Sequence, residues 1–275
     1  MGADGADLLV VARLLVLALV PAAASFAACG GGSTSRDSVA RAATKTSTSR
    51  SYRVEATTRL KVQGRDVTFT ADGAFDPKRK VGRTQLDMSQ LNEIQGGQGS
   101  PYNLGYATFI LSGTSIYMRI PLLRQTYPTL KPWVKIDLRN AARSGGLDSF
   151  LQFGAGGDPA SVLGYLKAVG KLHDEGSEKV RGVSTTHYSG TIDVGKLKGG
   201  ETLRRLTDQS TIPVDVWVDD NGYVRREQWK EKVSFGNRTS DLDLKLELFD
   251  FGAPVSAKVP PQSDVSDLSK LGAQS

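Results

Sequence analysis

Cys29 is the residue with the clearest capacity for chemistry, because it is the only cysteine in 275 residues. It follows Ala27 and Ala28, and an apolar run at residues 14–20 lies shortly before it. A thiol is nucleophilic enough to take a lipid group readily, and small residues before it let an extended chain lie in a peptidase groove. The pattern therefore indicates an apolar leader that ends in small residues, next to a thiol able to take a lipid.

The segment 26–29, Phe-Ala-Ala-Cys, resembles the lipobox of bacterial lipoproteins. This resemblance implies a thioether-linked diacylglycerol on Cys29 and a leader, residues 1–28, that is cut off before it. Two alternatives stay open: an ordinary secretory signal with a buried cysteine, and a single membrane anchor, although the apolar run is shorter than the ~20 residues that span a bilayer. Asp4 and Asp7 stand where a signal peptide carries positive charge, so we expect translation to begin later, at Val10 or Val11.

The chain carries a formal net charge of +6 at pH 7. In a cytosolic protein this excess would indicate nucleic acid as a partner, but an exported, lipid-tethered chain does not meet nucleic acid. We expect anionic headgroups or acidic wall polymers as its neighbours, at the extracytoplasmic face of the cell membrane. With its one cysteine acylated, the chain has no internal disulfide and depends on burial for stability.

Other residues give little sign of catalysis or metal binding. His173 and His187 are the two histidines, and His187 falls in an alternating strand pattern. The sequence contains neither Gly-x-Ser-x-Gly nor His-Glu-x-x-His, and Asp-Asp-Asn-Gly at 219–222, between two alternating runs, is typical of a hairpin turn. We therefore expect no enzyme activity, no cofactor and no metal site, with an envelope hydrolase as the weakest alternative.

A period of two in apolar residues runs through most of the chain and predicts strands with one buried face. It is clearest at residues 52–62, where Val54 and Ala56 alternate with Arg53 and Glu55. Further strands are expected at residues 67–75, 86–88, 107–111, 116–120, 214–218, 223–233 and 242–248. Together they predict a long, curved antiparallel sheet.

Three helices are expected, at residues 37–46, 158–170 and 201–209. Between the strands and the second helix lies a glycine-rich segment with bulky apolar side chains, which we expect to form a cavity entrance from Leu147, Phe150, Leu151 and Phe153. The chain then divides into a leader (1–28), a flexible tether (29–36), one domain (37–258) and a weakly ordered tail (259–275).

Two framework segments carry a more specific resemblance. These are Gly-Val-Ser-Thr-Thr-His-Tyr-Ser-Gly-Thr-Ile-Asp at 182–193 and Ile-Pro-Val-Asp-Val-Trp-Val-Asp at 212–219. With the lipobox and the opening strand, they resemble the actinobacterial LppX/LprG-type lipoproteins, which are similar in fold to the LolA/LolB carriers. The resemblance covers nearly all of the chain after Cys29. It implies an α+β fold: a strongly curved antiparallel half-barrel, with a few helices covering a hydrophobic cavity for acyl chains.

Alternation alone leaves open whether the inward faces enclose a cavity or a filled core, but their mixture of small and large residues favours a cavity. The expected lining is Val54, Ala56, Phe69, Ala71, Phe109, Leu111, Ile116, Met118, Val214, Val216, Leu244 and Leu246. Arg119 and Arg204 are candidates for contact with a lipid headgroup.

The function expected from this resemblance is binding of an acyl lipid or glycolipid by a membrane-anchored lipoprotein. Such a protein carries its lipid or presents it to a lipid exporter or another envelope protein. The alternative is a surface interaction or sensor lipoprotein with a filled core.

Overall fold

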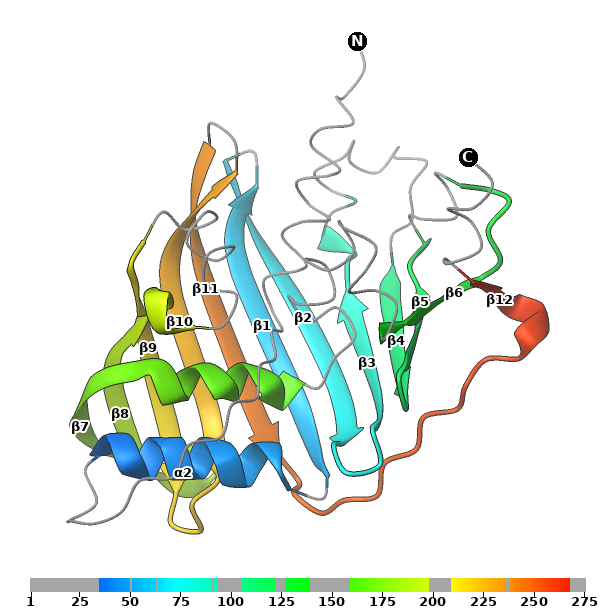
Figure 1. Ribbon diagram of the computed structural model, residues 1–275. Helices are drawn as coiled ribbons and strands as arrows, with labels where there is room; N and C mark the ends of the chain where they lie inside the picture. Colours follow the sequence, from blue (N-terminus) through cyan, green and yellow to red (C-terminus); the bar gives the residue numbers. More distant parts are fainter. Residues whose placement is uncertain are drawn as a thin grey trace.

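The structure, a computed structural model, describes residues 35–49, 51–62, 64–90, 92, 105–121, 127–138, 159–197, 209–235 and 238–267. The elements are α2 (Ser35–Ser47), β1 (Tyr52–Val62), β2 (Arg65–Asp76), β3 (Val81–Asp87), β4 (Tyr106–Ser112), β5 (Ser115–Arg119), β6 (Trp133–Asp137), η2 (Pro159–Ala168), β7 (Val169–Val180), β8 (Val183–Asp193), η3 (Val194–Lys196), β9 (Thr211–Asp219), β10 (Val224–Phe235), β11 (Arg238–Phe249), η4 (Gln262–Asp264) and β12 (Val265–Asp267). In Figure 1 the strands stand side by side, with α2 and η2 crossing them.

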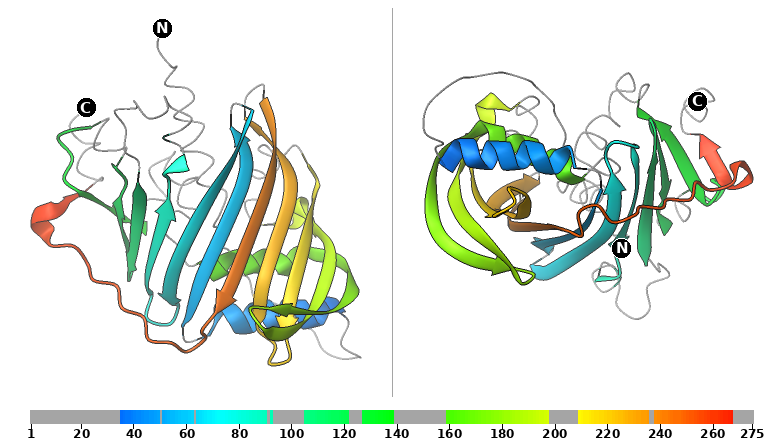
Figure 2. Two further views of the ribbon diagram at one scale, coloured as in Figure 1. Left: turned by 180° about the vertical axis from the view of Figure 1, so that it is seen from behind. Right: turned by 90° about the horizontal axis from the view of Figure 1, so that it is seen from below.

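Within the described residues the strands form one 12-stranded sheet in the order β12-β6-β5-β4-β3-β2-β1-β11-β10-β9-β8-β7. Strand β1 pairs with β2 on one side and with β11 on the other, so the two halves of the chain meet there. Figure 2 shows the sheet curling around the helices through β7, β8 and β9, and extending away through β4, β5 and β6. The predicted α+β half-barrel is therefore confirmed, with one parallel pair, β12 with β6, added to the antiparallel strands.

The period of two places apolar side chains on the concave face of the sheet. In β1, Val54 and Ala56 are buried, whereas Arg53 is exposed. Ala56 lies opposite Ala71 of β2 and opposite Leu246 of β11, so one apolar face continues across three strands. A shift of one residue would turn charged side chains inward, and the pattern therefore specifies the register.

Helix α2 lies on the concave side, at one end of the strands (Figure 1). Its buried residues are Val39, Ala42, Ala43 and Thr46. The Thr46 hydroxyl accepts a hydrogen bond from the Val224 backbone N–H at 2.9 Å, and Lys45 Nζ donates to the Asn221 carbonyl at 2.5 Å. These bonds attach α2 to the β9–β10 turn. The helix begins at Ser35, two residues before the predicted start, and so includes the last two residues assigned to the tether.

The helix predicted at 158–170 is the 3₁₀ helix η2, and it leads directly into β7. Leu163 and Leu166 are fully buried, as expected where side chains three residues apart eclipse one another. Val169 continues this buried face as the first residue of β7. Because η2 packs beside α2, the two helices together cover the β7 to β10 end of the concave face.

The tip of the β7–β8 hairpin is held to the convex side of the sheet by ion pairs. Arg181 donates from Nη2 to Glu55 Oε2 and from Nε to Glu247 Oε2, each at 2.8 Å. Glu247 is buried and also accepts a hydrogen bond from Arg226 Nε at 3.0 Å. The hairpin is thereby fixed to β1 and β11, which are not its neighbours in the sheet.

Replacing Arg181 with methionine is expected to lower the free energy of unfolding by about 1–3 kcal/mol, because two charge-assisted hydrogen bonds are lost and buried Glu247 loses a partner. Urea unfolding followed by circular dichroism measures this change. Lys179→Met is the matched control, since Lys179 is exposed on the same hairpin. Equal stability of the two variants would show that the Arg181 contacts do not hold the hairpin.

The C-terminal segment is more structured than a weakly ordered tail over residues 262–267, which form η4 and β12. Val265 pairs with Trp133 of β6 and is buried with Ile110 and Tyr117. The apolar residues of this convex-side cluster are therefore covered by the chain's own end. Three residues are too few for an alternating pattern, so the sequence gives no sign of β12. The predicted helix at 201–209 lies outside the described residues, apart from Gln209.

Candidate functional site

All twelve predicted lining residues lie on the same side of the sheet. Seven belong to the main cluster of buried residues, with side chains of α2 and η2: Val54, Ala56, Phe69, Val214, Val216, Leu244 and Leu246. Leu111, Ile116 and Met118 form a second cluster with Ile136 of β6. Ala71 and Phe109 are half-buried, and Phe109 packs against both clusters. Their contact with a lipid stays a prediction, as does the role of Leu147, Phe150, Leu151 and Phe153, which lie outside the described residues.

Two inward-facing glycines allow neighbouring atoms to pack closely and do not border an open space. A Cβ atom at Gly82 would lie 2.2 Å from Cδ1 of Phe75, its partner across β2 and β3. A Cβ atom at Gly73 would lie 2.7 Å from the carbonyl oxygen of Arg83. Small size at these two positions therefore does not indicate a cavity.

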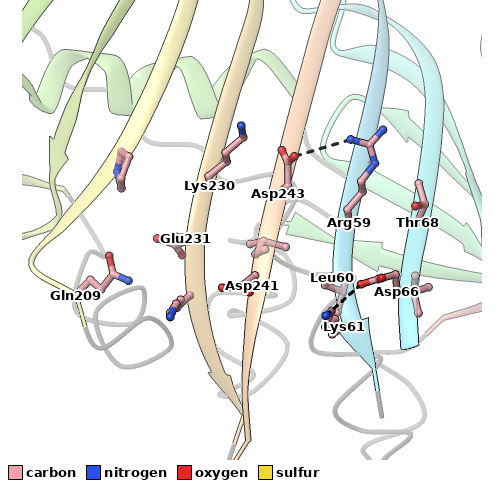
Figure 3. Close-up of a pocket in the computed structure, with 14 residues that line it drawn as sticks. Arg59, Leu60, Lys61, Asp66, Thr68, Gln209, Lys230, Glu231, Asp241 and Asp243 are labelled. Carbon is pink, nitrogen blue, oxygen red and sulfur yellow. Dashed lines mark ion pairs between the residues drawn. The ribbon is translucent and has the colours of Figure 1, made fainter. Parts of the chain in front are cut away.

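A cavity of about 670 Å³ lies near the end of β1 and the start of β2 (Figure 3). Its lining is Arg59, Leu60, Lys61, Asp66, Val67, Thr68, Gln209, Pro213, Lys230, Glu231, Lys232, Asp241, Leu242 and Asp243. This volume is within the range of about 300–1,000 Å³ typical of small-molecule sites. The cavity lies further along the strands than predicted, because Val67 and Leu242 precede the predicted Phe69 and Leu244 by two residues on the same face.

Charged side chains surround this cavity. Arg59 Nη1 lies 3.9 Å from Asp243 Oδ2, joining β1 to β11, and Lys61 Nζ lies 3.9 Å from Asp66 Oδ1 on β2. Figure 3 shows both ion pairs. The inward-facing wall contains apolar Leu60, whereas the surrounding charges are exposed to solvent or partly so. The arrangement suits a ligand with an apolar part inside and a polar part outside.

Two carboxyl groups lie on the inward face of β10. The sequence pattern predicts only a polar strand here and does not indicate that these groups are buried. Glu227 and Glu231 flank Trp229 and lie opposite Leu246 and Leu242 of β11. Glu227 is 2% exposed and Glu231 is 8% exposed. Burial raises the pKa of Glu227 to about 8, although its hydrogen bond from Trp229 lowers this pKa by a smaller amount. Burial also raises the pKa of Glu231 to about 7.

Tyr165 of η2 covers this part of β10. Its ring centroid lies 5.6 Å from that of Trp229. Burial raises the pKa of the Tyr165 hydroxyl, and the nearby Glu227 adds to the effect. The carboxyl of Glu227 is therefore enclosed between the sheet and the helix, whereas Glu231 reaches the cavity wall.

The other residues considered for chemistry lie elsewhere. Arg119 sits 5.4 Å from the ring centroid of Trp133 and is in register with Thr108 on the convex side, so it does not face the cavity. Its contact with a headgroup stays a prediction. Arg204 lies outside the described residues.

Of the two histidines, His187 stacks on Trp217 at 4.2 Å between centroids, and its Nε2 lies 2.9 Å from Asp215 Oδ1. His173 lies exposed on β7. The segment 219–222 forms the predicted turn, in which the Gly222 N–H donates to the Asp219 carbonyl at 2.8 Å. No group of three or more histidine, cysteine, aspartate or glutamate residues in the described chain is placed to hold a metal ion. The helices of the described ranges include none that is long and apolar enough to cross a bilayer.

An open, curved half-barrel with an apolar concave face is the class of fold that these observations define. Two Streptomyces proteins are similar in sequence. An uncharacterised protein of Streptomyces griseus is 28% identical over 155 residues, which is 51% of this chain and 50% of that protein. A proposed lipoprotein of Streptomyces coelicolor is 32% identical over 114 residues, covering 41% of this chain and 33% of that protein. The chain thus spans half or less of the curated relatives it matches.

Solved structures of similar fold include two mycobacterial proteins, of which LppX is a lipoprotein. LppX of Mycobacterium tuberculosis has a TM-score of 0.47 and 18% identity, over 81% of this chain and 97% of that one. LprF of Mycobacterium bovis has a TM-score of 0.46 and 15% identity, over 83% and 99%. The chain resembles the LppX/LprG-type lipoproteins, as the sequence motifs indicate. No family model matches the sequence.

Proposed function

We propose that this chain is a membrane-anchored extracytoplasmic lipoprotein that binds an acyl lipid or glycolipid on its concave face and carries or presents it in the cell envelope. The observation that carries the proposal is the continuity of the apolar face with the cavity. Leu60, Val67 and Leu242 extend the alternation of β1, β2 and β11 directly into the cavity wall. An acyl chain in the cavity would therefore meet apolar side chains along the strands.

The mechanism is solvation, with no bond made or broken. Each buried methylene gains about 0.8 kcal/mol relative to water, but an acyl chain that leaves a bilayer comes from hydrocarbon already. The free energy of moving an acyl chain from the membrane into the protein is therefore close to zero. This balance suits a carrier, because it must release its lipid as readily as it takes one up.

Anchor and binding face are separate parts of the chain in this proposal. The acyl groups on Cys29 hold the protein at the membrane, and the residues before α2 connect this anchor to the domain. Residues 30–34 are rich in glycine and serine, a composition typical of flexible connections. The domain is thereby kept within reach of lipids in the same membrane.

Ala71→Trp is the variant that tests the concave face. Ala71 is half-buried and lies between Ala56 of β1 and Leu86 of β3. An indole there takes the place of several methylenes of a bound chain, so we expect uptake of a fluorescent fatty-acyl probe to fall at least about tenfold. The melting temperature is expected to change little, because the volume is otherwise filled by lipid.

Thr70→Trp is the matched control, since Thr70 is exposed on the opposite face of the same strand. It is expected to bind the probe as the unaltered protein does. If Ala71→Trp instead loses the ~1–3 kcal/mol typical of an overpacked core, or binds the probe unchanged, the concave face is a filled core. The interaction-module alternative then replaces the carrier.

A further inference from the structure

Four of the cavity-lining residues face inward in the strand registers: Leu60, Val67 and Leu242 are apolar, and Glu231 is polar. It lies opposite Leu242 in the register of β10 and β11, and both residues line the cavity. Figure 3 shows Glu231 on β10, with Asp241 on the neighbouring strand. Glu227 lies on the same face, four residues earlier, with Trp229 between them. The strand thus carries two carboxyl groups into the apolar interior.

Each carboxyl keeps one oxygen without a partner. Glu227 Oε1 accepts a hydrogen bond from Trp229 Nε1 at 2.5 Å, but Glu227 Oε2 and Glu231 Oε2 are buried with no hydrogen-bond partner among the described residues. Leaving such a group unpaired costs about 1–3 kcal/mol, and native proteins keep few of them. Because Glu231 also lines the cavity, its unpaired oxygen indicates a partner that arrives with the ligand.

The charged residues near Glu231 have other positions or partners. Lys230 and Lys232 are exposed, and the adjacent strand positions alternate away from the inward face. Arg59 and Lys61 pair with aspartates rather than with Glu231. Glu231 therefore stays in surroundings that favour its protonated form, because burial disfavours the carboxylate.

A protonated carboxyl donates one hydrogen bond and accepts others, and an alcohol hydroxyl is the small neutral group that matches both roles. A phosphate would instead require cations, and a metal ion would require the ionised form with further ligands. We propose that Glu231 binds an alcohol hydroxyl of the lipid, on its glycerol or on an attached sugar. This inference rests on the proposed lipid-binding function and specifies which lipids bind best.

The test compares 1,2-dioleoylglycerol with its 3-acetyl ester, which differ by the free hydroxyl. Binding to the purified full chain is measured by displacement of a fluorescent fatty-acyl probe. The unaltered protein is expected to prefer the free alcohol about tenfold, the value of one good hydrogen bond in a buried site. Glu231→Leu is expected to bind both lipids equally, and Glu231→Gln, which still donates and accepts, is expected to retain the preference.

Lys179→Leu, at an exposed position of β7 outside the cavity lining, is the control and is expected to leave the preference unchanged. Glu231→Leu is expected to stay folded, because replacing an unpaired buried polar group with an apolar one of similar size is often neutral or stabilising. A melting curve checks this. A monoglucosyl dioleoylglycerol distinguishes a glycerol hydroxyl from a sugar hydroxyl. If this lipid binds more tightly than 1,2-dioleoylglycerol, and Glu231→Leu removes the difference, the site binds a sugar hydroxyl.

The outcomes separate this proposal from the function on which it rests. If neither lipid displaces the probe, lipid binding itself is wrong. If the alcohol and the ester bind equally well to the unaltered protein, lipid binding stands and the hydroxyl site is overturned. Binding of Ca²⁺ alone that disappears in Glu231→Gln, without any preference between the lipids, would also overturn it in favour of a cation site.

Discussion

A Cys29→Ser chain is expected to leave the membrane fraction completely. The lipobox resemblance places a diacylglycerol on the Cys29 thiol, and stable anchoring requires more than one acyl chain. Serine keeps the size of the side chain but removes the thiolate nucleophile that accepts the lipid. Fractionation of cells followed by immunoblotting, with globomycin-type inhibition of leader cleavage as a second readout, measures the effect.

Ser33→Ala is the matched control, because it also changes one small residue before the domain and leaves the thiol intact. This variant is expected to stay in the membrane pellet. Retention of mature Cys29→Ser protein in that pellet would contradict the anchor, and with it the lipoprotein assignment.

The second large effect concerns pH. Burial raises the pKa of Glu227 to about 8 and of Glu231 to about 7, from an ordinary value of 4.5. The folded protein therefore holds more protons than the unfolded chain above about pH 4.5. These two carboxyls therefore make the free energy of unfolding fall as pH rises from about 4.5 to 7–8.

Urea unfolding at pH 5, 6 and 7.5 measures this fall. Glu227→Gln combined with Glu231→Gln removes both titrations, and its stability is expected to depend much less on pH. Asp220→Asn, in the exposed part of the β9–β10 turn, is the control and should keep the pH dependence of the unaltered protein. Parallel curves for the unaltered protein and the double variant would show that the two carboxyls are not buried in their protonated form.

Strands with clear alternation could be predicted well from the sequence. The predicted strand at residues 52–62 has the bounds of β1, and the predicted turn at 219–222 joins β9 to β10. Strand β7 was missed because its sequence, from Val169 to Val180, is polar and largely exposed at the edge of the sheet. Strand β12 was missed because its pairing with β6 depends on a partner far away in the sequence.

The candidate site was only partly predictable, because alternation identifies a face but not the part of it that encloses space. Phe69 and Leu244 were chosen from the middle of their strands, while the cavity lies two residues further along, at Val67 and Leu242. Glu231 could have been found from its spacing to Trp229, since residues two apart share a face. Its burial, however, depends on the tertiary packing around β10, which no local pattern encodes.

The most direct test of the central claim is native mass spectrometry of the protein after mild extraction from its own membrane. The account predicts a main species heavier than the acylated chain by the mass of one lipid, released as a neutral acyl lipid or glycolipid on collisional activation. Ala71→Trp should show this species strongly reduced, and Thr70→Trp should show it unchanged. A clean mass of the acylated chain alone, in protein that remains folded, would contradict lipid binding on the concave face.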